Sequence, residues 1–182
     1  MLAGNPDKFA FLIERVNEWE SEGFVNGVMH VYINGKAYPK KLHTTTLNVD
    51  IAHLFNEDYS AFLRPKVSRK IYTMKGKKLF KQLRRLRFPA YYGDDKEADE
   101  DYRFDVSLEE ISNARYHVFV VTDGQKVRLL VGRWKNKKHL NKCKFLDETE
   151  ITAKKYQEII NRVYLYFHNN VEPASWKKEI PC

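Results

Sequence analysis

The chain has 182 residues, of which 43% are hydrophobic and 14% aromatic, and it carries a formal net charge of +8. This composition excludes a disordered chain and is typical of one globular domain, which we expect to span residues 1–182. No apolar run approaches the ~18 residues of a membrane-spanning helix. The sparing use of cysteine fits a reducing compartment such as a bacterial cytoplasm.

The positive charge is concentrated in two blocks. Between Arg64 and Arg87 lie eleven lysines and arginines and no carboxylate. A second basic stretch runs from Lys126 to Lys144. An acidic segment directly follows the first block and is expected to be a solvated loop that could fold back on it; its acids are Asp94, Asp95, Glu97, Asp99, Glu100 and Asp101.

The N-terminal region predicts a turn, a strand and a hairpin. Asn5-Pro6-Asp7 is turn chemistry, because Pro fixes φ and Asn and Asp bond to nearby backbone. Residues 8–19 fit either a helix or a strand by their apolar spacing. The pair Asn34-Gly35 predicts a hairpin between residues 28–33 and 36–38. Since a hairpin needs a partner to bury a face, we interpret residues 8–19 as a strand.

Two helices are predicted in the middle of the chain. The first covers residues 47–55, with Thr46 as its cap and Leu47, Ile51, Leu54 and Phe55 on one face. The second covers residues 76–87 and ends at Phe88-Pro89. Its apolar side comprises Leu79, Phe80, Leu83 and Leu86, with the basic residues on the other side.

The last third predicts a capped helix, a hairpin, a strand and a long helix. Ser107 and Glu110 fit a capping box. Asp123-Gly124 joins residues 116–122 and 126–134 in a second hairpin. Residues 143–150 are a candidate further strand, and residues 152–167 have helical apolar spacing. The order predicts an α+β fold, a single domain with an antiparallel β-sheet built from hairpins and packed by several helices.

No motif for catalysis, cofactor binding or metal binding stands out. The glycine-containing stretches lack the spacing of a phosphate loop, and no nucleophile elbow is present. His30 and His117 lie in predicted strands, where an ordinary sheet histidine is favoured over a general base. His139 and Cys143 are only two ligands and do not close a zinc site. We therefore predict no enzyme, no cofactor and no metal.

The basic helix at 76–87 allows three interpretations. It can be a solvated face neutralised by the acidic segment, or a docking face for an acidic protein. It can also be part of a nucleic-acid-binding module that uses residues 64–87, with Tyr72, Phe80, Tyr91 and Tyr92 available for stacking on bases.

Four stretches in order resemble a known family: "GNPDKFAFLIERVNEWE", "NGVMHVYINGK", "TTTLNVDIAHLF" and "ARYHVFVVTDGQKVRLLVGRW". Together they are similar to immunity protein family 42 of bacterial polymorphic toxin systems, of the contact-dependent growth inhibition type. The resemblance implies a non-catalytic cytoplasmic protein, encoded beside a toxin. Such a protein binds the toxin's C-terminal domain, with one-to-one stoichiometry expected, and blocks its active site or an essential surface.

Two contact regions are predicted under this resemblance. Immunity proteins against nucleases are often acidic, whereas this chain is basic. Either the toxin domain presents an acidic surface to the basic helix, or the acidic segment inserts into a basic toxin site. The predicted toxin-binding residues are Asp94, Asp95, Glu97, Asp99, Glu100, Asp101, Lys77, Lys81, Arg84 and Arg85.

Overall fold

A computed structural model describes residues 1–55, 62, 65–92, 99–134 and 143–173. Within these described residues, eight antiparallel strands form two sheets and are accompanied by five α-helices, so the predicted α+β class is confirmed. The strands are β1 (Leu2–Asn5), β2 (Phe9–Arg15), β3 (Asn26–Ile33), β4 (Lys36–Tyr38), β5 (Thr45–Thr46), β6 (Tyr116–Thr122), β7 (Lys126–Trp134) and β8 (Cys143–Thr152). The α-helices are α1 (Leu47–Phe55), α2 (Arg69–Tyr72), α3 (Gly76–Arg87), α4 (Glu109–Asn113) and α5 (Ala153–Tyr166).

The first sheet has the order β1-β2-β3-β4, with β5 paired to β3. The strand predicted over residues 8–19 is confirmed for Phe9–Arg15, whereas Asn17–Trp19 form a short 3₁₀ helix. The hairpin across Asn34-Gly35 is confirmed. The turn at residues 5–7 is also confirmed, since the Asn5 side chain accepts a hydrogen bond from the Asp7 backbone N–H at 2.9 Å. The strand β1, which was not predicted, precedes this turn and pairs with β2, so the turn joins a hairpin.

The second sheet has the order β6-β7-β8; its strands β6 and β7 are buried on both faces, whereas β8 is half-buried or exposed along most of its length. The hairpin across Asp123-Gly124 and the strand beginning at Cys143 are confirmed. One face of β6 carries Val118 and Val120 into the larger core cluster, which also takes residues from the first sheet, α1 and α5. The other face packs Phe119 and Val121 against α2 and α3. An uninterrupted apolar strand is typical of a sheet covered on both sides.

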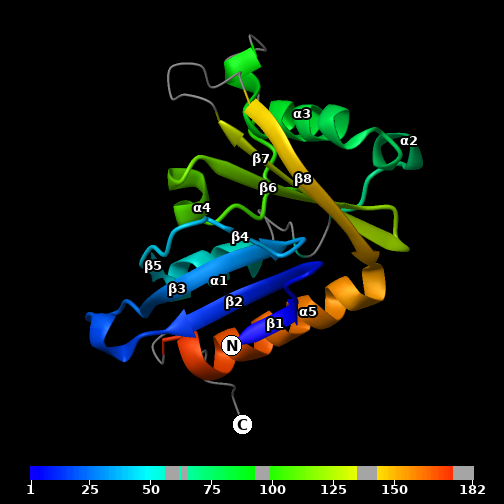
Figure 1. The fold of residues 1–182 in the computed structure, drawn as a ribbon. Helices are drawn as coiled ribbons and strands as arrows, with labels where there is room; N and C mark the ends of the chain where they lie inside the picture. Colours follow the sequence, from blue (N-terminus) through cyan, green and yellow to red (C-terminus); the bar gives the residue numbers. More distant parts are fainter. Residues whose placement is uncertain (56–61, 63–64, 93–98, 135–142, 174–182) are drawn as a thin grey trace.

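Figure 1 shows α5 running along the first sheet beside β1 and β2, whereas α3 lies at the opposite end of the molecule, beside β8. The two sheets are joined through the tip of the β3–β4 hairpin. There the Asn34 amide donates to the Asp147 carboxylate at 3.0 Å and to the Glu148 carbonyl at 2.9 Å, while Lys36 pairs with Asp147 at 2.6 Å. This link fixes the hairpin against the middle of β8.

The predicted starts or caps of three helices differ from those observed. The last helix was predicted to begin at Thr152, but α5 begins at Ala153 and Thr152 caps it, because its hydroxyl accepts from the Lys155 N–H at 3.2 Å. The capping box at Ser107 was wrong: α4 begins two residues later, and the Ser107 hydroxyl instead accepts from the backbone N–H of Val118 at 2.9 Å. Thr46 belongs to β5, and its hydroxyl donates to the Asn26 side chain at 3.2 Å.

Candidate functional site

The exposed face of α3 carries most of the predicted basic contact residues. Lys77, Lys81 and Arg85 are exposed, at positions four residues apart on one side of the helix. Arg84 is fully buried instead, with 0% of its surface exposed. Its side chain therefore does not belong to the basic face, and we remove it from the predicted contact set. The spacing from Phe80 to Arg84 is one helical turn, which places Arg84 on the apolar side.

Arg84 lies in an aromatic cluster at the C-terminal end of α3. Its guanidinium lies over the rings of Trp134, at 5.5 Å, and Phe88, at 5.9 Å. The ring of His117 is 4.7 Å from that of Trp134 and is 1% exposed. Burial lowers the pKa of His117 to about 3, with a further contribution from the charges of Arg84 and Arg87. This histidine is therefore neutral at physiological pH and is a packing residue.

The acidic segment is only partly described. Asp94, Asp95 and Glu97 lie outside the described residues, and Asp99 is exposed. Glu100 pairs with Arg87, and the Tyr102 hydroxyl donates to Glu100 at 2.8 Å. The predicted return of this segment onto the basic block is thus confirmed at Glu100.

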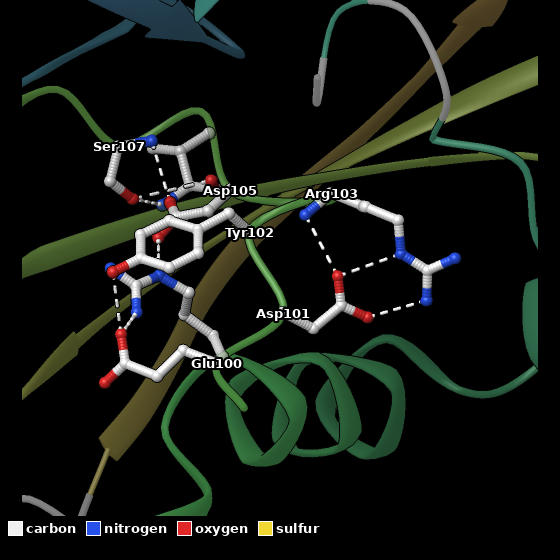
Figure 2. Close-up of polar contacts among 8 residues, drawn as sticks. Glu100, Asp101, Tyr102, Arg103, Asp105 and Ser107 are labelled. Carbon is white, nitrogen blue, oxygen red and sulfur yellow. Dashed lines mark hydrogen bonds and ion pairs between the residues drawn. The ribbon is translucent and has the colours of Figure 1, made fainter. Parts of the chain in front are cut away.

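Asp101 is engaged within its own loop. It accepts from the Arg103 side chain at 2.8 Å and 3.0 Å and from the Arg103 backbone N–H at 3.0 Å, as Figure 2 shows. The bonds to Arg103 outweigh its burial and lower the pKa of Asp101. Arg87 also pairs with Asp105 at 3.0 Å, and its guanidinium lies 3.5 Å from the centre of the Tyr102 ring. Glu100 and Asp105 therefore hold this segment on α3 through Arg87.

Three hollows with shared wall residues extend from the loop after β4, past the start of β6 and the paired ends of β7 and β8, to the start of α3. The first, of about 460 Å³, and the second, of about 360 Å³, share Arg115 and Arg133 in their walls. The third, of about 520 Å³, shares Lys144 with the second and is also lined by Lys77. Lys40, Lys41 and His43 complete the first hollow. We call the three hollows together the cationic groove.

The second basic stretch of the sequence therefore contributes Arg133 and Lys144 to the groove walls. Two further segments, which were not predicted to be functional, also line the groove. The loop after β4 contributes Lys40 and Lys41, and the turn between α4 and β6 contributes Arg115. The pairing of β7 with β8 shifts register between Val131 and Gly132, and Leu146 at this bulge lines the second hollow. Bulges commonly redirect side chains beside functional sites.

The described walls of the groove carry cations and no acidic side chain. Among the described residues, no carboxylate lines any of the three hollows. Elsewhere, cations such as Arg15, Arg103 and Lys126 pair with carboxylates of the same chain. Within the described part of the chain, six groove cations form no such ion pair: Lys40, Lys41, Lys77, Arg115, Arg133 and Lys144.

Other kinds of site have no geometric support among the described residues. No group of three or more His, Cys, Asp or Glu side chains is placed to hold a metal ion there. Of the weighed zinc pair, His139 lies outside the described residues, and burial raises the pKa of the Cys143 thiol to about 11. His30 is buried in β3 with its Nδ1 2.9 Å from the Pro39 carbonyl oxygen. No described helix is long and apolar enough to cross a membrane.

The described architecture is that of an α+β domain with two packed antiparallel sheets and a cationic groove lined by the loop after β4 and by the ends of β6, β7 and β8. A crystal structure of CdiI from Burkholderia dolosa AUO158 has the same fold, with a TM-score of 0.68 and 22% sequence identity over 91% of this chain and 99% of that chain. The chain has no match among curated protein sequences. The family model of Immunity protein 42 matches residues 1–166, and the chain belongs to this family.

Proposed function

We propose that this protein neutralises a cognate bacterial toxin by binding the toxin's C-terminal domain in the cytoplasm and covering its active site or an essential surface. The observation that carries the proposal is the match of the immunity-family model to residues 1–166, which is nearly the whole described chain. The similarity in fold to CdiI from Burkholderia dolosa AUO158 also supports this proposal.

The proposal makes the protein a stoichiometric binder and not an enzyme. Neutralisation by binding requires a stable surface complementary to the toxin, with no reacting group on the immunity protein. The two histidines weighed as general bases are consistent with this role. His117 and His30 are both buried, at 1% and 4% exposure, and a general base must reach the proton that it removes.

The alternative of a nucleic-acid-binding module retains the cationic groove and the exposed face of α3. Two of its four predicted stacking residues are weakened as candidates, because Tyr72 and Phe80 are 6% and 2% exposed, and the side chains of Tyr91 and Tyr92 are not among those described. Base stacking needs accessible aromatic faces. Charge alone is only the first property of a nucleic-acid-binding surface, so protein binding is favoured.

Copurification tests the proposal. The protein is co-expressed with the tagged toxin domain encoded beside it, and separately with a tagged toxin domain from an unrelated system. We expect a one-to-one complex with the cognate domain only, measured by size-exclusion chromatography with light scattering. Recovery of the cognate domain alone, without the immunity protein, would contradict the proposal.

A further inference from the structure

We propose that the cationic groove is the docking site for an acidic segment of the cognate toxin domain, whose carboxylates are received by Arg115, Arg133 and Lys144. The inference rests on the proposed function and specifies where the partner binds and what chemistry it presents. Three features of the free protein carry it: a like-charge strand pair, an unusual backbone conformation at an arginine, and an exposed leucine whose chain neighbours line the groove.

The first feature is a pair of cations directly opposite one another in the second sheet. Arg133 of β7 and Lys144 of β8 are partners in the strand register, and both line the second hollow. Like charges at such positions destabilise a sheet. Neither side chain has a carboxylate partner among the described residues. An external anion placed between them would remove the repulsion and gain two ion pairs.

The second feature is the backbone of Arg115. This residue has a φ of +68°, in the left-handed region that glycine and asparagine adopt far more readily. Its carbonyl accepts from the Trp134 N–H at 2.9 Å, which ties the turn to the end of β7. The side chain lines both the first and the second hollow. This backbone conformation favours glycine or asparagine, but here an arginine adopts it and lines the groove. Residues in unfavourable backbone conformations are concentrated at functional sites.

The third feature favours a protein over a nucleic acid as the occupant. Leu42 is 73% exposed and stands between Lys41 and His43, which line the first hollow. An exposed apolar side chain beside cations fits a peptide that carries carboxylates together with an apolar residue, because protein interfaces combine the two kinds of contact. No comparable gain is available from a phosphate backbone.

The variant Lys144→Glu separates binding from folding. It places a carboxylate opposite Arg133, so repulsion becomes attraction and Tm of the free protein should rise by about 2–4 °C. The same change removes one cation and adds a charge of the wrong sign for an acidic partner. Calorimetric titration with the isolated toxin domain should therefore give a Kd raised roughly 100-fold. A merely structural role for Lys144 would not move the two measurements in opposite directions.

A second groove variant and a control variant test whether the change in Kd is specific to the groove. Arg115→Asn keeps a residue that tolerates left-handed backbone, so Tm should be equal to or above that of the wild type while Kd rises about tenfold. The control is Lys154→Glu in α5, an exposed lysine outside the groove and without an ion pair in the described chain. It should leave Kd within about twofold of the wild-type value.

The outcomes distinguish the groove from the proposed function. If the wild type binds the toxin domain and both groove variants bind equally well, the groove inference is wrong while the proposed function stands. If the wild type does not bind, both fail. Binding of a fluorescent 20-nucleotide RNA to the wild type and to Lys144→Glu tests the nucleic-acid alternative. If the variant loses RNA binding while its affinity for the toxin domain is unchanged, the groove binds nucleic acid and the inference is wrong.

Discussion

At the scale of single residues, burial decides the role of charged and polar side chains more than residue type does. Arg84 was expected on the basic face because arginine is rarely buried. The helical period nevertheless places it one turn after Phe80, and the structure buries it against aromatic rings. The spacing was visible in the sequence. The sequence did not reveal that Trp134, at the end of β7, lies beside Arg84.

His117 gives a pH-dependent contribution to stability. Burial lowers its pKa to about 3 in the folded protein, whereas the unfolded chain has a value near 6.5. Between these values the unfolded state binds more protons. The free energy of unfolding should therefore fall as the pH decreases from about 6.5 toward 3, with a slope of up to ~1.4 kcal/mol per pH unit from this residue.

The variant His117→Phe tests this contribution. Among the described residues, neither ring nitrogen of His117 has a hydrogen-bond partner, so replacement by an apolar ring loses no hydrogen bond to them. We expect urea unfolding curves between pH 4 and 7 to show a smaller loss of stability on acidification in the variant than in the wild type. The quantity compared is the slope of the free energy of unfolding against pH. A difference between the two proteins that is the same at every pH reflects a change in packing. Parallel stability profiles would show that His117 does not titrate on unfolding.

At the scale of elements, local signals specified the hairpins but not their assembly. Asn34-Gly35 and Asp123-Gly124 were sufficient to place two hairpins, as observed. The strand β1 was missed because its four residues, "LAGN", carry almost no strand preference. The division of the strands into two sheets depends on long-range contacts such as Asn34 with Glu148, which no local pattern contains.

The close packing of α3 on β7 requires a glycine. A Cβ added at Gly132 would lie 2.4 Å from the Phe80 ring and 2.9 Å from the Lys144 carbonyl oxygen. Gly132→Ala should therefore lower the free energy of unfolding by about 1–3 kcal/mol, as measured by urea denaturation.

Removing the obstructing ring provides the matched control for this glycine. In a Phe80→Leu background the same Gly132→Ala change should cost at least 0.5 kcal/mol less, by the size of typical coupling between contacting residues. Equal costs in both backgrounds would mean that Phe80 is not the obstacle.

At the scale of the whole molecule, part of the positive charge of this +8 chain lies along the cationic groove and the exposed face of α3. The cationic groove continues onto α3 through Lys77, next to exposed Lys81 and Arg85. The α3 part of this surface was predictable from helical spacing. The groove was not, because its walls come from the loop after β4, the turn before β6 and the paired ends of β7 and β8, which are far apart in the chain.

Such a surface should steer an acidic partner. Under the proposed function, we expect the association rate constant with the toxin domain to fall about tenfold as NaCl rises from about 50 to 500 mM, because salt screens long-range attraction. The dissociation rate constant should change much less. Stopped-flow fluorescence measures both, and an association rate independent of salt would show that the cationic surface does not guide the encounter.

Growth in the presence of the toxin tests the central claim most directly. Bacteria that express the cognate toxin domain from an inducible promoter are compared with and without co-expression of this protein, and with co-expression of an immunity protein from an unrelated system. Our account predicts that growth is restored by this protein alone. Continued growth arrest, with both proteins shown to be present at comparable levels, would contradict it.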